Sequence, residues 1–508
     1  MNLLSSTYVF SFFTLISRIL GYLRDILIAI FLGASIFADA FFVAFRLPNT
    51  FRRLFAEGTF NAAFIPFYTS EKIKSRKKGK KFADDVFKFL VIALFFVILL
   101  VEIFTPYLVY LIAPGFFENS IKFNLAVDFT RITFPFLMFV CLSSFFSGIL
   151  NSNNKFAAAA AAPIILNIVL ILSLLVSYSF KLNFAEQLSY GVTLGGFVQL
   201  LFLIYFTKRY YKPSLEFKTN LNNKVKFFFK KLLPSVLSSG VTQINILVGT
   251  IIASFETSAV SYLYYADRVY QINLAIAGIA VGTVSLPILS KAFNQKNIKK
   301  ISNIQSRSIE LSLLFSLPAS LGLILASDEI INALFGYGSF TTKNVEMTAS
   351  ALKYFGYGIP AFALVKILSN FFFARNNTKT PFYISSFVVL TNIFISVMFF
   401  NEIGFIIIPI ATSISTWIGV FIYIYLLYIK NFLLVKDYLF KNILIIVLNT
   451  ILLSFILLFA LNNFSEYLEY SYKYKSIYLL IIVSFVAGFY LISCYLSGVL
   501  KKENFKTN

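Results

Sequence analysis

Histidine is absent from this chain of 508 residues, which also has only two cysteines and one tryptophan. Without histidine, the protein has no imidazole to act as a proton relay, general base or metal ligand. The two cysteines, Cys141 and Cys494, lie in apolar runs, so we expect buried free thiols rather than a disulfide. The single tryptophan leaves aromatic anchoring at a membrane surface to the 63 Phe and 29 Tyr.

Acidic residues are scarce, because 22 Asp and Glu stand against 44 Lys and Arg, for a net charge of +22. In a soluble protein this excess would suggest a nucleic-acid partner. The chain is 58% hydrophobic, with a mean hydropathy of +0.81, and its basic residues lie between apolar runs. We therefore predict a polytopic membrane protein with no nucleic-acid partner. The start, MNLLSSTYVFSFF, lacks a basic region and a cleavage site, so we expect it to begin the first helix.

The apolar runs predict an all-α membrane protein of about fourteen spans. A helix needs about 20 apolar residues to cross a bilayer. The predicted spans lie near 7–32, 38–69, 83–112, 125–150, 157–178, 188–208, 229–254, 261–290, 306–327, 346–373, 380–401, 404–429, 440–462 and 476–500.

The loop charges predict the orientation of these spans. With the N-terminus inside, the cytoplasmic segments and tail hold 29 Lys and Arg, and the opposite loops hold five. Because positive residues stay on the cytoplasmic side, both termini are predicted to be cytoplasmic. The richest basic segments are 71–81, 208–231 and 291–307.

An internal repeat divides the chain into two halves. Pro135 matches Pro360 and Asn167 matches Asn392, both at a spacing of 225 residues. Six predicted spans separate the matches, and an even number preserves orientation, so the halves should be parallel lobes around a central cavity. This arrangement suits alternating access. We predict an N-terminal lobe at 1–210 (spans 1–6), a C-terminal lobe at 211–430 (spans 7–12), and 431–508 with the last two spans and a cytoplasmic tail.

The segment from Ser17 to Glu57 carries unusually many charges for a membrane-embedded sequence. One charge at the bilayer centre costs roughly 2.5–3.5 kcal/mol, so eight facing lipid would cost on the order of 20 kcal/mol. These residues must face a water-filled cavity, pair with one another, or both. Their positive sum suggests an anionic passenger. The eight are Arg18, Arg24, Asp25, Asp39, Arg46, Arg52, Arg53 and Glu57.

Helical geometry separates the arginines by role. Arg53 and Glu57 are four residues apart and suit an ion pair, whereas Arg52 points about 100° away and suits a free guanidinium. Guanidinium groups bind phosphate oxygens through two parallel hydrogen bonds. The candidate substrate-binding residues, for a pyrophosphate, are Arg18, Arg24, Arg52 and Arg268. The candidate cavity or pairing residues are Ser17, Asp25, Asp39, Asn49, Arg53, Glu57 and Asp267.

A competing interpretation needs no ligand. In it the charges form buried ion pairs: Arg18 with Asp25, Arg53 with Glu57, and Asp267 with Arg268 or a neighbour. This interpretation leaves the positive excess unexplained. Elsewhere, we expect Arg131 to snorkel or to pair with Asp128.

Four segments resemble a known family: SRILGYLRDILIA, ADAFFVAFRLPNTFRRLFAEGTFNAAFIP, ILNSNNKF and YYADRVYQINLAIAGIAVGTVSLPILSKAF. They closely resemble the MurJ (MviN) lipid II flippases of the multidrug/oligosaccharidyl-lipid/polysaccharide exporter superfamily, and the resemblance runs through all fourteen spans. It implies a non-enzymatic flippase in the bacterial inner membrane. The substrate would be undecaprenyl-pyrophosphate disaccharide-pentapeptide, moved to the periplasmic leaflet for peptidoglycan synthesis. Other cell-wall synthesis proteins are further partners to test.

The resemblance also implies site residues and one departure. Arg18, Arg24, Arg52 and Arg268 match the essential cavity arginines of the family, and two extra helices would form a groove for the lipid tail. Some members have carboxylates for sodium, where this chain has Gly249 and Asn377. We therefore expect no metal and no cofactor, and coupling to membrane potential or to a proton. The candidate proton carriers are Asp25, Asp39 and Glu57.

Two alternatives remain open at this stage. One is a flippase for another polyprenyl-pyrophosphate glycan, such as an O-antigen unit, because pyrophosphate-binding arginines do not distinguish the two. The other is a membrane enzyme acting on such lipids. The only acidic pair in a basic region is Asp84–Asp85, which we interpret as solvated residues at a helix start.

Overall fold

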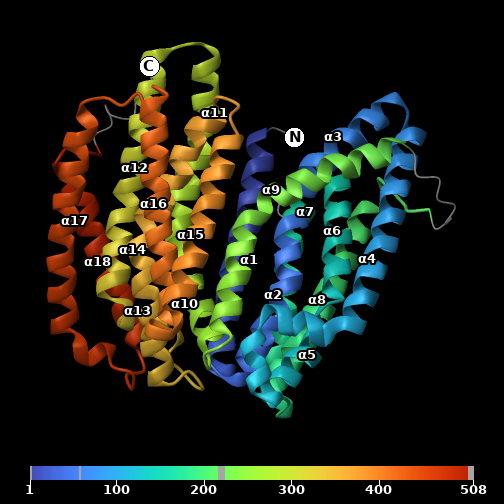
Figure 1. Ribbon diagram of the computed structural model, residues 1–508, viewed down its shortest axis with the longest axis horizontal. Coiled ribbons are helices and arrows are strands. Elements are labelled where there is room, and N and C mark those ends of the chain that lie inside the picture. The colour runs from blue at the N-terminus through green and yellow to red at the C-terminus, as the bar shows by residue number, and fades with distance from the viewer. Residues whose placement is uncertain (1–2, 57–58, 215–222, 501–508) are drawn as a thin grey trace. The chain divides into compact units, whose positions relative to one another are not determined.

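The computed structural model describes residues 3–56, 59–214 and 223–500. Every regular element in these ranges is helical, and ten helical segments among them are long and apolar enough to cross a membrane. The all-α membrane class predicted from the sequence is therefore confirmed. The chain divides into two compact units, unit 1 (Met1–Ser261) and unit 2 (Tyr262–Asn508) (Figure 1).

Unit 1 is a helix bundle. Within it, α7 packs against α1 and α8, and α2 packs against α5. Its helices are α1 (Leu3–Leu32), α2 (Ile36–Ala56), α3 (Thr59–Lys74), α4 (Arg76–Ile112), α5 (Ser120–Thr133), α6 (Phe136–Ser152), α7 (Phe156–Phe180), α8 (Phe184–Thr207) and α9 (Asn223–Ala253), with a 3₁₀ turn at Pro114–Glu118.

An aromatic core joins α3 to its neighbours in unit 1. Phe64 is fully buried and stacks on Phe60 and Tyr68, with ring centroids 5.3 Å and 5.4 Å away. Gly148 on α6 allows this packing, since a Cβ there would lie 2.8 Å from the Phe64 ring. A larger residue at Gly148 would have to displace a fixed aromatic ring.

The second predicted span, 38–69, differs from the structure. Two helices cover it: α2 ends at Ala56 and α3 begins at Thr59. Gly58 in the sequence between them is a poor helix former. The predicted basic loop 71–81 is also largely helical, because only Ser75 separates α3 from α4, where its hydroxyl accepts a hydrogen bond from Lys78 N.

The interpretation of Asp84 as a solvated residue is wrong. Asp84 is only 9% exposed, and its Oδ1 accepts hydrogen bonds from the Tyr211 hydroxyl at 2.6 Å and from Ser214 N at 3.1 Å. Burial and the Asp84 carboxylate raise the pKa of Tyr211, so the hydroxyl keeps its proton and donates. Asp84 lies eight residues after the start of α4 at Arg76, so the predicted position at a helix start is wrong as well. Asp84 ties this part of α4 to the chain after α8.

Unit 2 is a second helix bundle. Within it, α12 packs against α14 and α17, and α14 packs against α16. Its helices are α10 (Ala259–Leu274, which begins in unit 1), α11 (Val281–Asn294), α12 (Ile298–Leu325), α13 (Ser327–Phe335), α14 (Thr342–Phe373), α15 (Lys379–Ile403), α16 (Ile407–Ile429), α17 (Tyr438–Asn463) and α18 (Lys475–Leu496), with a π-helical turn at Ala275–Ala280.

Side chains hold the connections of unit 2 in place. The Gln305 side-chain amide makes two hydrogen bonds to the segment between α16 and α17. It donates to Phe432 O and accepts from Leu434 N. At the start of α18, buried Lys475 donates to Asn332 Oδ1 at 2.9 Å, with two backbone carbonyls as further acceptors. These contacts fasten the last two helices to the rest of unit 2.

Most predicted spans correspond to helices. Predicted spans 380–401 and 404–429 are α15 and α16, and span 440–462 is α17. The ten apolar segments do not establish the number fourteen, and the three-part division at 210 and 430 also stays a prediction. Both cysteines are free and buried, as predicted.

Candidate functional site

Arg24 is the most enclosed of the candidate arginines. It is 7% exposed, and its Nε and Nη2 donate to Asp25 Oδ1 at 3.0 Å and 2.6 Å. Its Nη1 donates to Asn167 Oδ1 on α7 at 2.9 Å. The Asn167 amide in turn donates to the Ser17 carbonyl at 2.9 Å. Gly21 leaves room for this amide, since a Cβ there would lie 3.5 Å from Asn167 Nδ2.

Arg18 lies on a different face of α1. Six residues along a helix turn a side chain by about 240°, which explains why Arg24 faces α7 and Arg18 does not. The Arg18 side chain is exposed and, in the described part of the chain, makes no hydrogen bond or ion pair. The alternative pairing of Arg18 with Asp25 is therefore not formed. Arg18 presents a guanidinium available to an anion.

The α2 arginines differ from the expected pattern. Arg52 is half-buried, and its Nε donates to Asn49 Oδ1 at 2.9 Å, so it is not the free guanidinium that the spacing suggested. Arg46 and Arg53 are also half-buried. Glu57 lies outside the described residues, which leaves its pairing with Arg53 a prediction.

Asp39 lies in the first turn of α2, as expected for an acidic residue near a positive helix end. It is completely buried and pairs with Lys122 Nζ at 2.6 Å. It also accepts hydrogen bonds from the backbone N–H groups of Ser258 and Ser261, at 3.0 Å and 2.9 Å. Asp39 therefore joins α2 and α5 to the turn before α10.

In unit 2, Arg268 is half-buried on α10. Its Nη2 donates to the Tyr264 hydroxyl at 2.9 Å, and its guanidinium lies 4.7 Å from the centre of the Tyr264 ring. Asp267 accepts a hydrogen bond from Gln271 and does not pair with Arg268. A guanidinium held against a ring keeps its other N–H groups oriented for an acceptor.

The two positions at which the resemblance led us to look for a sodium site, Gly249 and Asn377, carry neutral residues. Asn377 Oδ1 accepts the backbone N–H of Thr380 at 3.1 Å, and its amide donates to the Thr380 hydroxyl at 3.0 Å. The Asn377 side-chain oxygen therefore accepts a backbone hydrogen bond from the first turn of α15. Among the residues described, no cluster of three or more Asp, Glu or Cys is placed to hold a metal ion.

Sequence reasoning missed the partners of the charged residues. The sequence singles out Asn167 only because it matches Asn392 in the internal repeat. It singles out Lys122 only as one of the five basic residues in the loops predicted to lie opposite the cytoplasm. Their partners, Arg24 and Asp39, lie 143 and 83 positions away in the chain. No local spacing rule connects residues at such separations.

Comparison with known proteins decides the family. The family model described as "Lipid II flippase MurJ" matches residues 28–505. A probable lipid II flippase MurJ of Rhizobium tropici is 40% identical over 412 residues, covering 80% of this chain and 77% of the relative. The corresponding protein of Rickettsia prowazekii is 38% identical over 420 residues, covering 82% of each. The chain belongs to the MurJ family of lipid II flippases.

Solved structures agree with this membership of the MurJ family. A lipid II flippase MurJ in an inward closed conformation has a TM-score of 0.82 and 28% identity, covering 98% of this chain and 100% of that one. An inward-facing MATE family multidrug transporter of the MOP superfamily has a TM-score of 0.67 at 14% identity, covering 82% and 94%, which shows the shared fold alone. MurJ membership makes the chain a multi-pass membrane transporter rather than an enzyme.

Proposed function

We propose that this chain moves lipid II, the undecaprenyl-pyrophosphate disaccharide-pentapeptide, from the cytoplasmic to the periplasmic leaflet by alternating access. The observation that carries this proposal is the MurJ match over residues 28–505. The structural likeness over 98% of the chain supports it, because it includes both units and the last two helices. Arginines that suit pyrophosphate support the same substrate class.

Arg18, Arg24, Arg52 and Arg268 are proposed to bind the pyrophosphate. Arg18 supports this assignment most simply, since it is exposed and makes no hydrogen bond or ion pair among the described residues. Arg24 already donates to Asp25 and Asn167, so a phosphate that binds it has to replace one of these acceptors. Arg52 and Arg268 would each bring a planar guanidinium, whose geometry suits phosphate oxygens.

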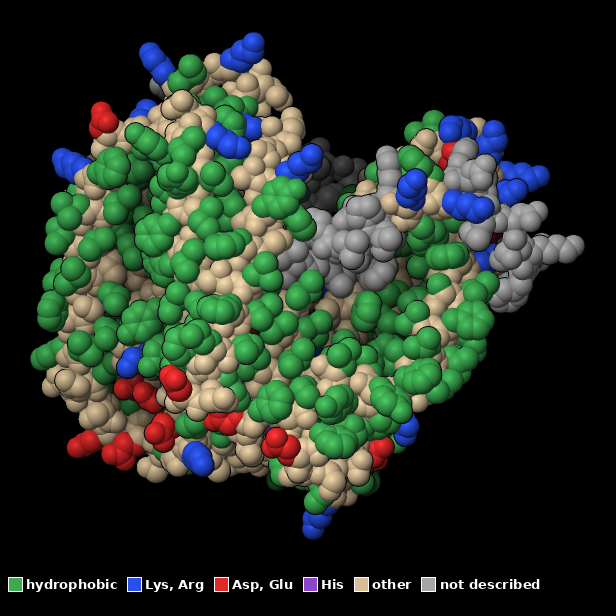
Figure 2. Space-filling model, in the orientation of Figure 1, with side chains coloured by type: hydrophobic (Ala, Val, Ile, Leu, Met, Phe, Trp, Pro, Cys, Tyr) green, Lys and Arg blue, Asp and Glu red, His purple; other side chains and the backbone are tan. Residues whose placement is uncertain are grey.

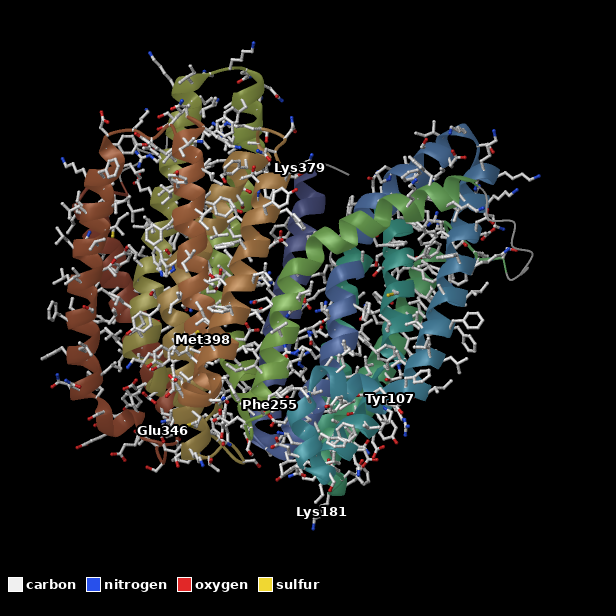
Figure 3. The ribbon with its side chains drawn as sticks, in the orientation of Figure 1. Tyr107, Lys181, Phe255, Glu346, Lys379 and Met398 are labelled. Atoms are coloured by element: carbon white, nitrogen blue, oxygen red, sulfur yellow. The ribbon has the colours of Figure 1, made fainter. Side chains whose placement is uncertain are left out.

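The proposed location is the bacterial inner membrane with both termini cytoplasmic. The charge distribution within unit 2 supports this orientation (Figures 2 and 3). Lysines around the α11–α12 connection, and Lys379 at the start of α15, gather at one end of its helices. Acidic residues that include Glu346 gather at the opposite end. Positive charge remains on the cytoplasmic side of membrane proteins, which supports a cytoplasmic position for the Lys379 end. Other cell-wall synthesis proteins are proposed partners.

Membrane potential is the proposed driving force. The neutral Gly249 and Asn377 favour a mechanism without sodium. Transport should therefore persist when sodium is replaced by choline at constant membrane potential, and should fall when an ionophore collapses the potential. Transport lost on sodium removal alone would contradict this proposal.

Complementation of cells depleted of their own lipid II flippase tests the function and the arginines together. The wild-type chain should restore growth, and Arg18→Ala, Arg24→Ala, Arg52→Ala and Arg268→Ala should each fail at matched membrane levels. Arg209→Ala, an exposed arginine after α8, is the control and should restore growth.

Two results would overturn parts of this proposal. An inserted wild-type chain that fails to restore growth would favour another polyprenyl-pyrophosphate glycan, such as an O-antigen unit, as the substrate. Rescue by all four arginine variants would retain lipid II transport and remove the site assignment.

A further inference from the structure

The outer face of α4 is built to contact lipid. Phe96, Leu100, Ile103 and Tyr107 recur at spacings of three or four residues and are 61%, 58%, 63% and 73% exposed. Figure 2 shows hydrophobic side chains over this side of unit 1, and Figure 3 places Tyr107 near the end of α4 that approaches α5. Apolar residues on one exposed helix face of a membrane protein indicate contact with acyl chains.

Two opposite charges flank this apolar face. Glu102 lies ten residues before the end of α4 at Ile112, and Arg131 lies eleven residues after the start of α5 at Ser120. Both therefore lie about three helical turns along the chain from the connection between the helices. Since α4 and α5 pack together, the two side chains are neighbours.

Neither charge is satisfied within the described chain. Arg131 is exposed and Glu102 half-buried, and neither side chain makes a hydrogen bond or an ion pair with another described residue. Arg131 lies near enough to act electrostatically on Glu102, but the two form no ion pair. The expected pairing of Arg131 with Asp128 is also not formed, and the Asp128 side chain is exposed as well. Charged side chains within membrane-spanning segments normally pair with an opposite charge or contact another polar group.

The backbone of α4 is kinked at Phe104, two residues after Glu102. Pro106 removes the N–H that would bond the Glu102 carbonyl, and Phe104 leaves helical geometry, with φ −100° and ψ 17°. The hydroxyl of Thr105 compensates by donating to the carbonyls of Val101 and Glu102, at 2.7 Å and 3.2 Å. The bend is thus stabilised by a buried threonine whose hydroxyl binds the backbone carbonyl of Glu102.

We propose that this α4–α5 face binds the headgroup of a phosphoethanolamine lipid, with the lipid phosphate on Arg131 and its ammonium on Glu102. The charges decide the headgroup. A phosphatidylglycerol would satisfy Arg131 but would bring a second negative charge next to Glu102. A phosphatidylcholine carries both charges, but its trimethylammonium has no N–H to donate to a carboxylate. Of these three headgroups, only ethanolamine supplies both an acceptor for Arg131 and a positively charged donor for Glu102.

Quenching of a site-specific tryptophan by brominated lipids tests this proposal. Trp417 is the only native tryptophan, so Trp417→Phe gives a background for single reporters. Phe104→Trp places the reporter beside Glu102, and Phe485→Trp places the control on a lipid-exposed position of α18. Both variants are reconstituted in vesicles that contain brominated phosphatidylethanolamine, phosphatidylcholine or phosphatidylglycerol among unbrominated lipid.

Quenching of the Phe104→Trp reporter should be about threefold stronger with brominated phosphatidylethanolamine than with either of the other brominated lipids. A preference of this size is typical of exposed charge pairs. The Phe485→Trp reporter should show no preference. Added to the Phe104→Trp reporter, Glu102→Gln should abolish the preference over both other lipids, because the Glu102 carboxylate is the group that distinguishes the headgroups. Arg131→Gln should weaken the binding of all three lipids, because each of them offers a phosphate to Arg131. Asp128→Asn, one turn from Arg131, should leave the preference unchanged.

Three results would overturn the proposal. They are equal quenching by all three lipids at Phe104→Trp, a preference for phosphatidylglycerol there, and a phosphatidylethanolamine preference that survives Glu102→Gln. Native mass spectrometry of the unmodified chain with an equimolar lipid mixture gives an independent measurement. Phosphatidylethanolamine should be retained by the wild type, and less of it by Arg131→Gln. Equal retention by the two proteins would count against the site.

Discussion

Lys122 on α5 and Asp39 on α2 form a buried ion pair, with 2.6 Å between Nζ and Oδ2 and side chains 6% and 0% exposed. The Lys122 ammonium also lies 4.0 Å from the centre of the Phe116 ring. Because Asp39 additionally binds Ser258 and Ser261, the pair holds three parts of unit 1 together.

Lys122→Met should destabilise the protein, because it leaves the Asp39 carboxylate buried without its cation. Breaking one side of a buried pair costs about 3–5 kcal/mol. The measurement is thermal unfolding of the detergent-solubilised chain, with Lys181→Met as a control at an exposed lysine. Adding Asp39→Asn to Lys122→Met should recover part of the loss. A double variant less stable than Lys122→Met would contradict the pairing.

Asn167→Leu should impair transport more than Asn392→Leu, its match in the other repeat. Asn167 orients Arg24 and binds the Ser17 carbonyl, whereas Asn392 donates to the Thr412 hydroxyl and accepts from the Ser396 hydroxyl. Each lost hydrogen bond to a charged group costs about 1.5–3 kcal/mol. Complementation at matched membrane levels measures the difference. Equal growth with both variants would argue against a specific role for Asn167.

Lys475→Met should loosen the attachment of α18. The Lys475 ammonium donates to Asn332 Oδ1, Gly336 O and Tyr470 O, and methionine leaves these acceptors without a donor. We expect a loss of about 3 kcal/mol in the free energy of unfolding, from unsatisfied buried acceptors. Lys473→Met, at an exposed neighbour, is the control. Unfolding at the same temperature in both variants would disprove this role.

Glu329→Gln should stabilise the protein at neutral pH and not in acid. Burial raises the pKa of the Glu329 carboxyl, and nearby Asp328 adds to the rise, while the Glu329 backbone N–H opposes it. A raised pKa means that folding favours the protonated form, so wild-type stability falls as pH rises through the ordinary and then the raised pKa. The variant does not ionise and escapes this loss.

Thermal unfolding at about pH 4 and about pH 7.5 measures this effect, because the two values bracket the ordinary carboxyl pKa and its rise. Glu402→Gln, at an exposed glutamate of α15, serves as the control. The difference between Glu329→Gln and wild type should appear at the higher pH and shrink at the lower one. An equal difference at both values would contradict the assignment.

The apolar helices could be predicted closely because their length is set by the bilayer. The span predicted at 440–462 is α17 at Tyr438–Asn463. Polar helix extensions could not be found this way, because hydropathy stops where charges begin. That is why α4 starts at Arg76, inside the predicted basic loop. The burial of Asp84 was missed because its partners, Tyr211 and Ser214, come from the distant segment after α8.

The candidate site could be predicted in its residue types but not in its contacts. Spacing along α1 groups Arg18 with Asp25 on one face, yet Asp25 pairs with the adjacent Arg24. A flexible guanidinium can fold back onto its neighbour when a second acceptor, here Asn167, fixes its far side. Helical periodicity describes one helix at a time and contains no information about α7.

The most direct test of lipid II transport is the leaflet in which the lipid lies. Cells depleted of their own flippase are labelled in the cell-wall precursor, and a membrane-impermeant hydrolase is added outside to cleave exposed lipid II. The wild-type chain should restore the cleaved fraction to that of undepleted cells, and Arg18→Ala should not. Lipid II that stays protected although the wild-type chain is inserted at normal levels would contradict the proposed function.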